Sequence, residues 1–389
     1  MRISVLGLGR LGFPLFNVLA RAGYEMVGID PKVSNWPVVA EEHRIIPPTT
    51  TEPGLEFPDG ILGRCQFAPD PQPADVNFIV VPTPSLDKGD HAGGFDSAYV
   101  ETALRHIRNV NKPAVPIAVI VSTLSPGTCN RLVTQFSQLR IVYNPTFIAL
   151  GNVVRGLTDP DLLLIGGNDD EAKGIVIRIW SNVLERVGPE KPKGVYIHGG
   201  SFTEIELIKL SVNAALGTKI SLANSLGQLF AAYGVSPKAV EVIGHDPRIG
   251  TAMMMPGSPI SGPCLPRDNR ALQVAATRVG VNLPLSVATD RVNWLLLDSI
   301  RNRVLACKPA SVGILGLSYK YGIDVDTAAP GPWLMEQMKK EGIVCFGYDE
   351  LIPRDSLEET LNADLIVVTQ KEYRPLLEGT TAQVVDLWE

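Results

Sequence analysis

The feature that most constrains the fold is a glycine-rich turn near the start of the chain, Gly7-Leu8-Gly9-Arg10-Leu11-Gly12. A predicted strand, Arg2–Leu6, precedes this turn and a predicted helix, Leu11–Ala22, follows it. A GxGxxG motif alone is a weak signal, but this strand–turn–helix context is the one that dinucleotide binding requires. Its glycines permit a tight turn, close approach to a pyrophosphate and close packing of the helix on the strand. The sequence therefore predicts a doubly wound Rossmann domain.

A carboxylate follows at the place where such a turn needs one. Asp30 closes the next predicted strand, Glu25–Asp30, roughly 20 residues beyond the glycine-rich turn. A carboxylate there accepts hydrogen bonds from both ribose hydroxyls and repels a 2′-phosphate. The predicted cofactor is therefore NAD rather than NADP, although Lys32 is a nearby cation that would favour NADP.

The first half of the chain continues as alternating strands and helices, which is the pattern of a parallel sheet with crossover helices. A Pro-rich stretch at 31–73 is expected to be irregular. After it, the predicted strands are Val76–Val81, Val115–Val121, Arg140–Tyr143 and Leu162–Ile165, and the predicted helices are Ser97–Val110, Cys129–Gln138 and Glu171–Arg186.

Two turns at the ends of these strands are candidate contacts for the nicotinamide ribose. They are Val81-Pro82-Thr83-Pro84 and Ser122–Thr128, which contains Thr123. Ligands of doubly wound sheets bind at the carboxyl ends of strands, and hydroxyl groups suit a ribose. Taken alone, each turn is equally typical of an ordinary loop.

The middle of the chain differs in kind. Phe202–Tyr233 contains no proline, and its apolar residues recur at helical spacing through Leu207, Leu210, Ala214 and Ile220. This pattern predicts one long helix that serves as a spine and a dimer surface. The alternative is two ordinary core helices.

From Ser311 the strand–helix–strand pattern begins again. The predicted elements are the strands Ser311–Ser318, Val344–Asp349 and Ala363–Thr369 and the helix Gly331–Glu341. The predicted fold class is α/β, with an N-terminal Rossmann domain, a central long helix and a smaller C-terminal Rossmann-like domain. The predicted domains are 1–200 for NAD, 201–300 for the central helices and dimerisation, and 301–389 for a nucleotide sugar.

Composition excludes several classes of protein. The net charge is −6, and no basic stripe interleaved with aromatic residues is present, which argues against nucleic acid as a partner. No apolar run approaches the roughly 18 residues that a membrane span needs. The five cysteines are irregularly spaced without a CxxC pair, so neither a disulfide framework nor a metal site is predicted. We therefore expect a soluble, cytoplasmic protein with reduced thiols.

The most informative short stretch is Ser261-Gly262-Pro263-Cys264-Leu265-Pro266-Arg267-Asp268. A cysteine between Gly-Pro and Leu-Pro is held on a stiff, irregular backbone. Near cations such as Arg267 and Lys209, its thiol would have a lowered pKa and become nucleophilic. The alternative from this stretch alone is a buried structural cysteine.

Lys209 and Asn213 are four residues apart on the predicted long helix, hence on one face and one turn apart. A lysine and an asparagine aimed at one point can stabilise an oxyanion. Taken alone, this pair is more typical of a solvated helix face.

Taken in chain order, these motifs form a set that resembles one family. The set is GLGRLG, VPTPS, STLSPGT, NPTFIALG, the Lys209–Asn213 helix, DPRIG, GPCLPRDN and GLSYK. It is similar to the nucleotide-sugar 6-dehydrogenases, which act on UDP-glucose, UDP-N-acetyl-mannosamine or GDP-mannose. The likeness covers nearly the whole chain.

The resemblance implies a reaction with two hydride transfers. The sugar's 6-hydroxyl is oxidised to an aldehyde, Cys264 adds to it, a second NAD takes a hydride to leave a thioester, and water releases the uronate. Lys209 and Asn213 would hold the oxyanion, and Asp268 would orient the site. Thr123 would supply a hydroxyl on the path of the water or proton.

The resemblance also implies contacts with the substrate and with a second copy of the chain. Phe147 and Lys320 would lie near the nucleotide sugar, and Arg248 would reach it across the interface of a homodimer. The uronate product would serve polysaccharide or glycoconjugate biosynthesis.

Three positions depart from the family pattern. The family usually has a glutamate directly after Asn-Pro, where this chain has Thr146, and many members carry a second glutamate at the position of Leu150. The first glutamate is the one assigned to activating water. The usual arginine of the substrate loop is replaced by Thr327. The cofactor site and the thiol are intact, so the end product is affected more than the class of reaction.

Three functional hypotheses follow. The first is oxidation of a nucleotide sugar, with UDP favoured by family frequency, to its uronate. The second is a two-electron oxidation that stops at the 6-aldehyde or uses an altered acceptor, because Thr146 replaces the hydrolytic glutamate. The third is a catalytically silent ligand-binding subunit, against which the retention of Cys264, Lys209, Asn213 and Asp268 together argues.

Overall fold

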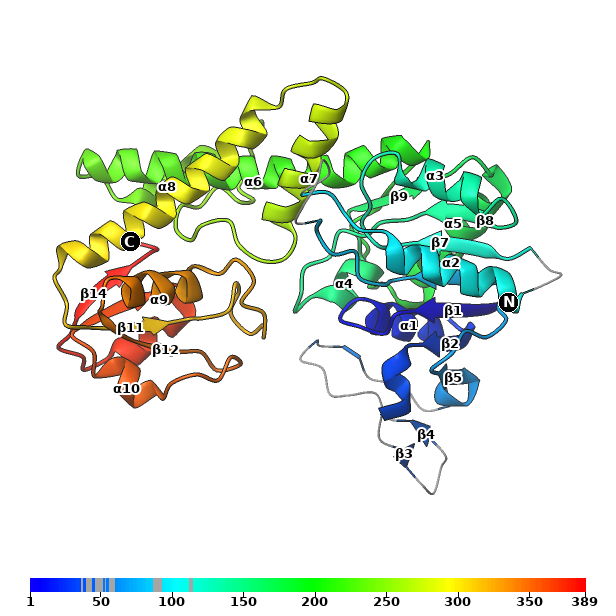
Figure 1. Ribbon diagram of the computed structural model, residues 1–389, viewed down its shortest axis with the longest axis horizontal. Coiled ribbons are helices and arrows are strands. Elements are labelled where there is room, and N and C mark those ends of the chain that lie inside the picture. Colours follow the sequence, from blue (N-terminus) through cyan, green and yellow to red (C-terminus); the bar gives the residue numbers. More distant parts are fainter. Residues whose placement is uncertain are drawn as a thin grey trace. The chain divides into compact units, whose positions relative to one another are not determined.

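The residues form two compact units, Met1–Lys209 and Leu210–Glu389. The structure is a computed structural model that describes residues 1–35, 38–39, 44–45, 52, 54–55, 60–86, 93–111 and 115–389. Each unit contains a parallel β-sheet with helices (Figure 1). One continuous helix, α6 (Phe202–Ala232), contributes residues to both units.

The first unit is built on one large sheet. In its described residues the strands are β1 (Arg2–Leu6), β2 (Glu25–Ile29), β5 (Cys65–Ala68), β6 (Val76–Ile79), β7 (Ile117–Ile120), β8 (Arg140–Tyr143), β9 (Leu162–Gly166) and β10 (Tyr196–Gly200), with β3 (Val38–Val39) and β4 (Arg44–Ile45) as a separate antiparallel pair. The helices are α1 (Gly12–Arg21), α2 (Ala98–Val110), α3 (Thr128–Gln135), α4 (Val153–Thr158) and α5 (Asp170–Val187), with 3-10 turns η1 (Pro31–Asn35) and η2 (Leu62–Arg64).

The strand order of this sheet reverses direction at β1. The order is β10-β9-β8-β7-β6-β1-β2-β5, and neighbours are parallel except β8 and β9. The chain leaves β1 toward β2 and β5 on one side and returns to β6 on the other. Doubly wound sheets bind ligands at the carboxyl ends of strands where this reversal occurs. Since Leu6 pairs with both Ile29 and Ile79, the residues that follow these three strands meet at one edge.

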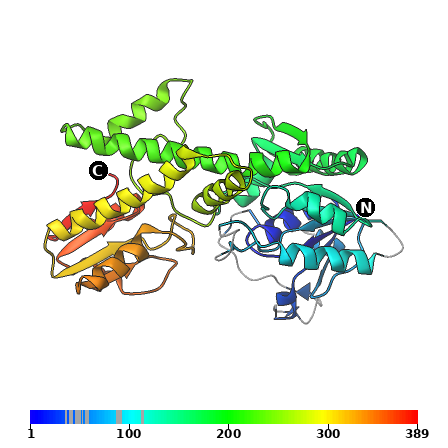
Figure 2. The ribbon, with the colours of Figure 1, turned by 45° about the horizontal axis from the view of Figure 1, so that its top comes forward.

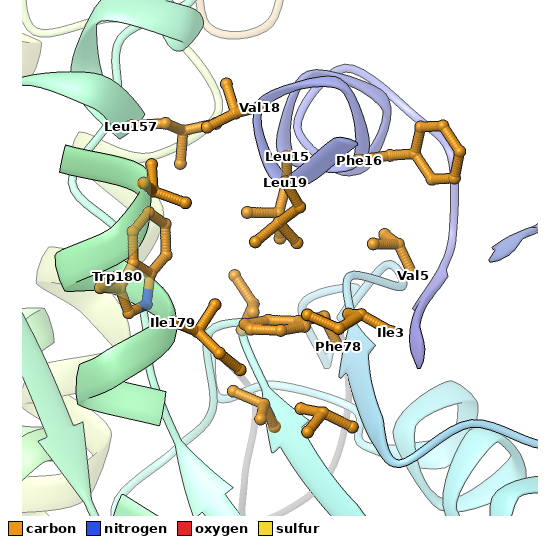
Figure 3. Packing of buried hydrophobic residues seen from close by; sticks show 14 of the residues in the cluster. Ile3, Val5, Leu15, Phe16, Val18, Leu19, Phe78, Leu157, Ile179 and Trp180 are labelled. Carbon is orange, nitrogen blue, oxygen red and sulfur yellow. The ribbon is translucent and has the colours of Figure 1, made fainter. Parts of the chain in front are cut away.

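Apolar side chains of helices cover both faces of the sheet, with α1 and α5 in one buried cluster and α2 and α3 in another. Figure 3 shows Leu15 and Leu19 of α1 turned toward Ile3 and Phe78 of the sheet, with Trp180 of α5 beside them. All five are buried. Full burial of side chains of this size stabilises by about 1.5–3 kcal/mol each, which holds α1, and with it the end of the glycine-rich turn, against β1.

The second unit carries a smaller sheet. Its described strands are β11 (Ser311–Leu315), β12 (Val344–Tyr348), β13 (Leu365–Val368) and β14 (Gln383–Asp386), all parallel in the order β12-β11-β13-β14. Besides α6, its helices are η3 (Pro237–His245), α7 (Leu265–Arg278), α8 (Pro284–Ala306), α9 (Pro330–Lys340), α10 (Leu357–Leu361) and η4 (Lys371–Leu377). Ile300 and Val304 of α8 and Leu334 and Met338 of α9 belong to one buried apolar cluster with residues of this sheet. Figure 2 shows α8, drawn in yellow, running along this sheet.

The observed fold confirms the predicted class and corrects one segment. The Rossmann start, the single long helix and the second α/β sheet are present as expected. The prediction that 31–73 is irregular is wrong at Cys65–Ala68, which forms β5 and pairs with β2. This strand lies at the sheet edge and has only four residues, Cys-Gln-Phe-Ala, so it is too short to show either an apolar run or a clear alternation. The boundaries 1–200, 201–300 and 301–389 stay a prediction.

We predict that a single buried hydrogen bond steadies the turn after β8. The Trp180 indole Nε1 donates to Oδ1 of Asn144 at 2.7 Å, and both residues are buried. Trp180→Phe keeps a ring but leaves that oxygen without its donor, which costs about 1–3 kcal/mol in addition to lost packing. Urea denaturation should show this loss. Trp333→Phe, in the second unit, controls for the change of ring, and equal losses in the two variants would contradict the prediction.

Candidate functional site

The glycine-rich turn has the geometry that a pyrophosphate needs. Gly7 has a φ of +93°, and a Cβ there would collide with the carbonyl of Val80. A Cβ on Gly12 would collide with the carbonyl of Gly7, so this glycine lets α1 approach β1. A Cβ on Gly9 would meet no atom within 4 Å, which leaves the space beside the turn open. Each glycine thus has the role that the motif predicts, and the turn fits a dinucleotide.

Asp30 both shapes this turn and offers a carboxylate to it. Its Oδ2 accepts the N–H of Leu8 at 2.9 Å, and its Oδ1 accepts the N–H of Lys32 at 2.9 Å. Each carboxylate oxygen has two acceptor positions, so capacity for the ribose hydroxyls remains. The Gly7 N–H also donates to the carbonyl of Ile29 at 2.8 Å, which ties the turn to the strand that Asp30 follows. Arg10 and Leu11 lie in the same turn, between Gly9 and Gly12.

The two hydroxyl-rich turns lie side by side, because β6 and β7 are neighbours. The Ser122 hydroxyl donates to the carbonyl of Val81 at 2.7 Å and so joins them. Thr83 is buried and Thr123 is partly exposed. The structure therefore brings both candidate threonines to the edge of the sheet that carries the glycine-rich turn.

A buried carboxylate that was not predicted from the sequence fixes the second of these turns. Glu206 of α6 is inaccessible to solvent and accepts the N–H groups of Gly127 at 2.6 Å and Cys129 at 2.7 Å. Burial raises the pKa of Glu206, despite these hydrogen bonds, which favour the ionised form. The signal that could have revealed it is a carboxylate placed between Ile205 and Leu207, three residues before Lys209 and hence on the same helix face.

The turn that contains Thr146 is held by buried hydrogen bonds of Asn144. Asn144 donates through Nδ2 to the carbonyl of Leu164 at 2.8 Å and accepts from Trp180. Thr146 and Phe147 follow and are partly buried. The Lys209 Nζ lies 4.6 Å from the centre of the Phe147 ring, a cation–π distance. A predicted oxyanion-binding group and a predicted substrate contact therefore adjoin one another in the first unit.

The second unit brings together the predicted cysteine site. Cys264 is exposed and caps the start of α7. Asp268 lies one turn further on, is 1% exposed, and accepts a hydrogen bond from Nδ2 of Asn213 at 2.6 Å. The Arg267 Nε is 3.9 Å from the other carboxylate oxygen of Asp268. The positive end of α7 favours negative charge on the sulfur.

The other two predicted substrate residues lie on loops of this unit. Arg248 is exposed and forms two hydrogen bonds with Asp246, at 3.0 and 2.7 Å, and these lower the pKa of that carboxyl. The Nζ of Lys219 holds the same loop by donating to the carbonyls of Ile249 and Gly250 at 2.9 and 2.8 Å. Lys320 is exposed on the loop that follows β11.

The turn at Gly7–Gly12 is the one by which Rossmann dehydrogenases hold a dinucleotide, which defines the class of the protein. Residues 1–184 match the NAD-binding domain of the UDP-glucose/GDP-mannose dehydrogenase family, and residues 203–294 match the central domain of that family. The chain belongs to this family. It is an NAD-dependent nucleotide-sugar dehydrogenase.

Individual relatives agree with this assignment. A GDP-mannose 6-dehydrogenase of Pseudomonas putida is 28% identical over 408 residues, which cover 99% of this chain and 89% of the relative. A UDP-glucose 6-dehydrogenase of Haloferax volcanii is 29% identical over 94% of this chain and 86% of the relative. Among solved structures, a UDP-glucose dehydrogenase from Pyrobaculum islandicum shares the fold with a TM-score of 0.82 at 24% identity, covering 100% of this chain and 94% of its own.

Two further observations concern the cysteines and the helices. None of the five cysteines forms a disulfide bond. None of the helices in the described part of the chain combines the length and apolar character needed to cross a bilayer.

We predict that the charge of Asp30 sets the preference for NAD. Loss of the hydrogen bond to the 2′-hydroxyl, about 1–1.5 kcal/mol, together with repulsion of the 2′-phosphate corresponds to a preference over NADP of about 10-fold or more. Asp30→Asn keeps an oxygen that can accept the Leu8 N–H but removes the charge, so it should weaken NAD binding and narrow the preference. Calorimetry with both cofactors measures this. Equal binding of NADP by the wild-type protein would show that Lys32 or Arg10 dominates instead.

Proposed function

We propose that this enzyme oxidises the 6-hydroxyl of a nucleotide sugar, with a UDP-sugar as the first candidate, to the uronate through a thioester on Cys264. The observation that carries the proposal is the arrangement around this thiol. An exposed cysteine stands at the start of a helix, one turn from a buried carboxylate whose partner is Asn213. That combination suits a nucleophile beside a preorganised oxyanion site.

The hydrogen bond between Asn213 and Asp268 supports an oxyanion role for the amide. An ionised carboxylate only accepts hydrogen bonds, so Asp268 requires that the NH2 group of Asn213 faces it. One amide N–H is then used at 2.6 Å, and the second N–H of the same group is directed by the same rotamer. Asp268 is in this view an orienting residue, and Asn213 together with Lys209 would stabilise the negative oxygen.

The proposed reaction consists of an oxidation, an addition, a second oxidation and a hydrolysis. NAD, when bound at the glycine-rich turn, accepts the hydride in each oxidation. In the first step the alcohol loses a hydride and its hydroxyl proton and becomes an aldehyde. The Cys264 thiol then adds to the aldehyde, with an S–C bond formed and its proton passed to the carbonyl oxygen, and loss of a second hydride and of that hydroxyl proton leaves a thioester. Water breaks the S–C bond, which frees the thiol and the uronate. Thr123 would lie on the path of the water or proton, while Phe147, Arg248 and Lys320 would contact the substrate.

Thr146 favours a second candidate product, the 6-aldehyde. General-base assistance to thioester hydrolysis is worth about 10²–10⁴-fold and needs a group that accepts a proton near neutral pH. A threonine hydroxyl orients water but does not accept that proton, and Leu150 supplies no carboxylate either. The enzyme would then either accumulate the thioester or release the aldehyde before the second oxidation.

The cytoplasmic location that is expected from the cysteine pattern is a further part of the proposal.

Counting NADH per sugar tests these alternatives. The protein is incubated with NAD and a panel of nucleotide sugars. A ratio near two supports the uronate, near one the aldehyde, and zero across the panel a silent subunit. Cys264→Ser should remove the second NADH. Cys307→Ser, a change at a thiol that is partly buried against the apolar cluster of the second unit, should leave the ratio of NADH to sugar unchanged.

We further predict that deacylation is the slow step and that Thr146→Glu relieves it. The wild-type enzyme should show a burst of NADH followed by slow turnover, with an acyl adduct on Cys264 visible by intact mass. Thr146→Glu should speed uronate formation, by up to about 10²-fold if the new carboxylate acts as a base. Thr146→Gln has the same size without the base and should not. Two NADH per sugar without a burst, and no gain in Thr146→Glu, would mean that another base serves the site.

A homodimer is the second part of the proposal. Large apolar side chains of the helical part of the second unit remain at least half exposed, and they include Leu222, Leu229, Tyr233, Leu285, Trp294 and Leu295. An exposed apolar surface of this kind marks an interaction site. We expect a second copy to cover it, with Arg248 of one protomer reaching the site of the other.

Mixing two variants that form no uronate tests the dimer. Arg248→Ala should bind no sugar productively and Cys264→Ser should stop at the aldehyde, so uronate formation is the activity measured. If Arg248 acts across the interface, each mixed dimer contains one complete site, so an equal mixture regains about a quarter of the wild-type activity after exchange of protomers. If Arg248 serves its own protomer, the mixture stays inactive. Light scattering that gives a fully active monomer would rule out the dimer altogether.

A further inference from the structure

Two glycines of the segment that leads to the thiol each lie under an aromatic ring from the C-terminal part of the second unit. We call this segment, Pro256–Cys264, the cysteine loop. A Cβ on Gly262 would lie 2.6 Å from Cδ2 of Tyr319, and a Cβ on Gly257 would overlap the ring of Trp388. Only a residue without a side chain permits these contacts. The end of the chain that carries Trp388 lies beside the helices of this unit in both views (Figures 1 and 2).

Hydrogen bonds reinforce the contact at Gly262. Its N–H donates to the carbonyl of Thr327 at 2.9 Å, and the neighbouring Ser261 hydroxyl donates to the carbonyl of Tyr319 at 3.4 Å. Tyr319 donates through its own N–H to the carbonyl of Val325 at 2.8 Å, which closes the loop after β11. Ala328 follows with a φ of +54°, a left-handed conformation that costs an alanine about 1–2 kcal/mol. The loop therefore keeps a strained residue next to the carbonyl that holds Gly262.

The residues that follow β13 bind the Trp388 ring and the backbone directly before Tyr319. The Trp388 indole N–H donates to the carbonyl of Thr369 at 3.0 Å. The side chain of Gln370 donates to the carbonyl of Ser318 at 2.6 Å, directly before Tyr319. Ser318, Thr369 and Gln370 are all buried. The two aromatic contacts are thus parts of one rigid support.

Helices hold the other side of the cysteine loop. Asn224 of α6 accepts the N–H of Gly257 at 2.8 Å, and Asn293 of α8 accepts the N–H of Ile260 at 2.6 Å. These bonds fix the first part of the loop. Gly262, two residues before Cys264, takes its partners from the C-terminal part of the second unit, while the Cys264 carbonyl accepts the N–H of Asp268 in α7 at 2.8 Å. The backbone that leads to the thiol is therefore held between α7 and the C-terminal part of the unit.

We propose that Tyr319 and Trp388 form an aromatic clamp on the cysteine loop and act as positioning residues for the Cys264 thiol. The inference rests on the proposed function in that Cys264 is taken as the nucleophile. The clamp fixes the backbone from which the thiol projects, and neither ring needs to touch the substrate. A displacement of about 1 Å at a reacting group can lower the rate by about 10²-fold, so loss of one ring should slow the chemistry without weakening cofactor binding.

Two readouts test the clamp in the full-length enzyme. The first is the rate at which iodoacetamide alkylates Cys264, followed by mass spectrometry, which needs no substrate. The second is the separation of kcat from the KM for NAD. We expect Trp388→Leu and Tyr319→Leu to change the alkylation rate by at least about 3-fold and to lower kcat by about 10–100-fold, with the KM for NAD within about 2-fold. Trp388→Phe and Tyr319→Phe keep a ring and should restore most of both values.

Trp333→Leu is the matched control, because Trp333 is also partly buried against the same apolar cluster but lies on α9. It removes a similar packing contribution, so its melting temperature should fall about as far as that of Trp388→Leu while Cys264 stays as reactive as in the wild type. If Trp388→Leu does not fold, Tyr319→Leu decides alone. Wild-type alkylation and kcat in the Leu variants, or changes no larger than in Trp333→Leu, would overturn the clamp. Absence of NADH formation by the wild type would instead overturn the proposed function, and the alkylation rates would still decide on the clamp.

Discussion

The buried polar face of α6 is the constraint on which the rest of the site depends. Polar side chains that are almost inaccessible recur along it every three or four residues, with Gly217 in the one gap, and they are Glu206, Lys209, Asn213, Ser221 and Asn224. This is the spacing of a single helix face. Glu206 binds the turn beside the cofactor edge, Asn213 binds Asp268, and Asn224 binds the cysteine loop. A buried polar group left unpaired costs about 1–3 kcal/mol, so rotation of α6 by one residue would lose several partners at once.

The two units use the same Rossmann turn for different purposes. Gly316 has a φ of +105° and bonds to the end of β12, as Gly7 bonds to the end of β2. In the first unit the acid after the second strand, Asp30, keeps capacity for a ribose. Its counterpart Asp349 is buried. One of its carboxylate oxygens already accepts three hydrogen bonds, from the N–H of Leu317 and from the N–H and the hydroxyl of Ser318. The second acid therefore stabilises a long loop, and that loop reaches the cysteine segment.

The sequence predicted those parts of the molecule in which local pattern and final role coincide. The glycine-rich turn, Asp30 and the long helix follow from spacing and residue type alone, because their neighbours in space are also near in the chain. The Asn213–Asp268 bond joins residues far apart in the chain, and only the family resemblance indicated that they belong together. Glu206 and Trp388 were missed for the same reason. Their partners are backbone groups of distant loops, and a backbone N–H or a glycine leaves no side-chain signal to match.

The backbone that carries Thr146 and Thr327 is held by groups other than these two side chains. Thr146 stands on a turn in which the Asn144 side chain accepts a hydrogen bond from Trp180, so this turn does not depend on the residue at position 146. Thr327 holds Gly262 through its carbonyl, which any residue supplies, so the cysteine loop does not depend on the side chain of Thr327. Both side chains can therefore change while the segments that carry the proposed site stay in place, and a substitution at position 146 tests the chemistry rather than the fold.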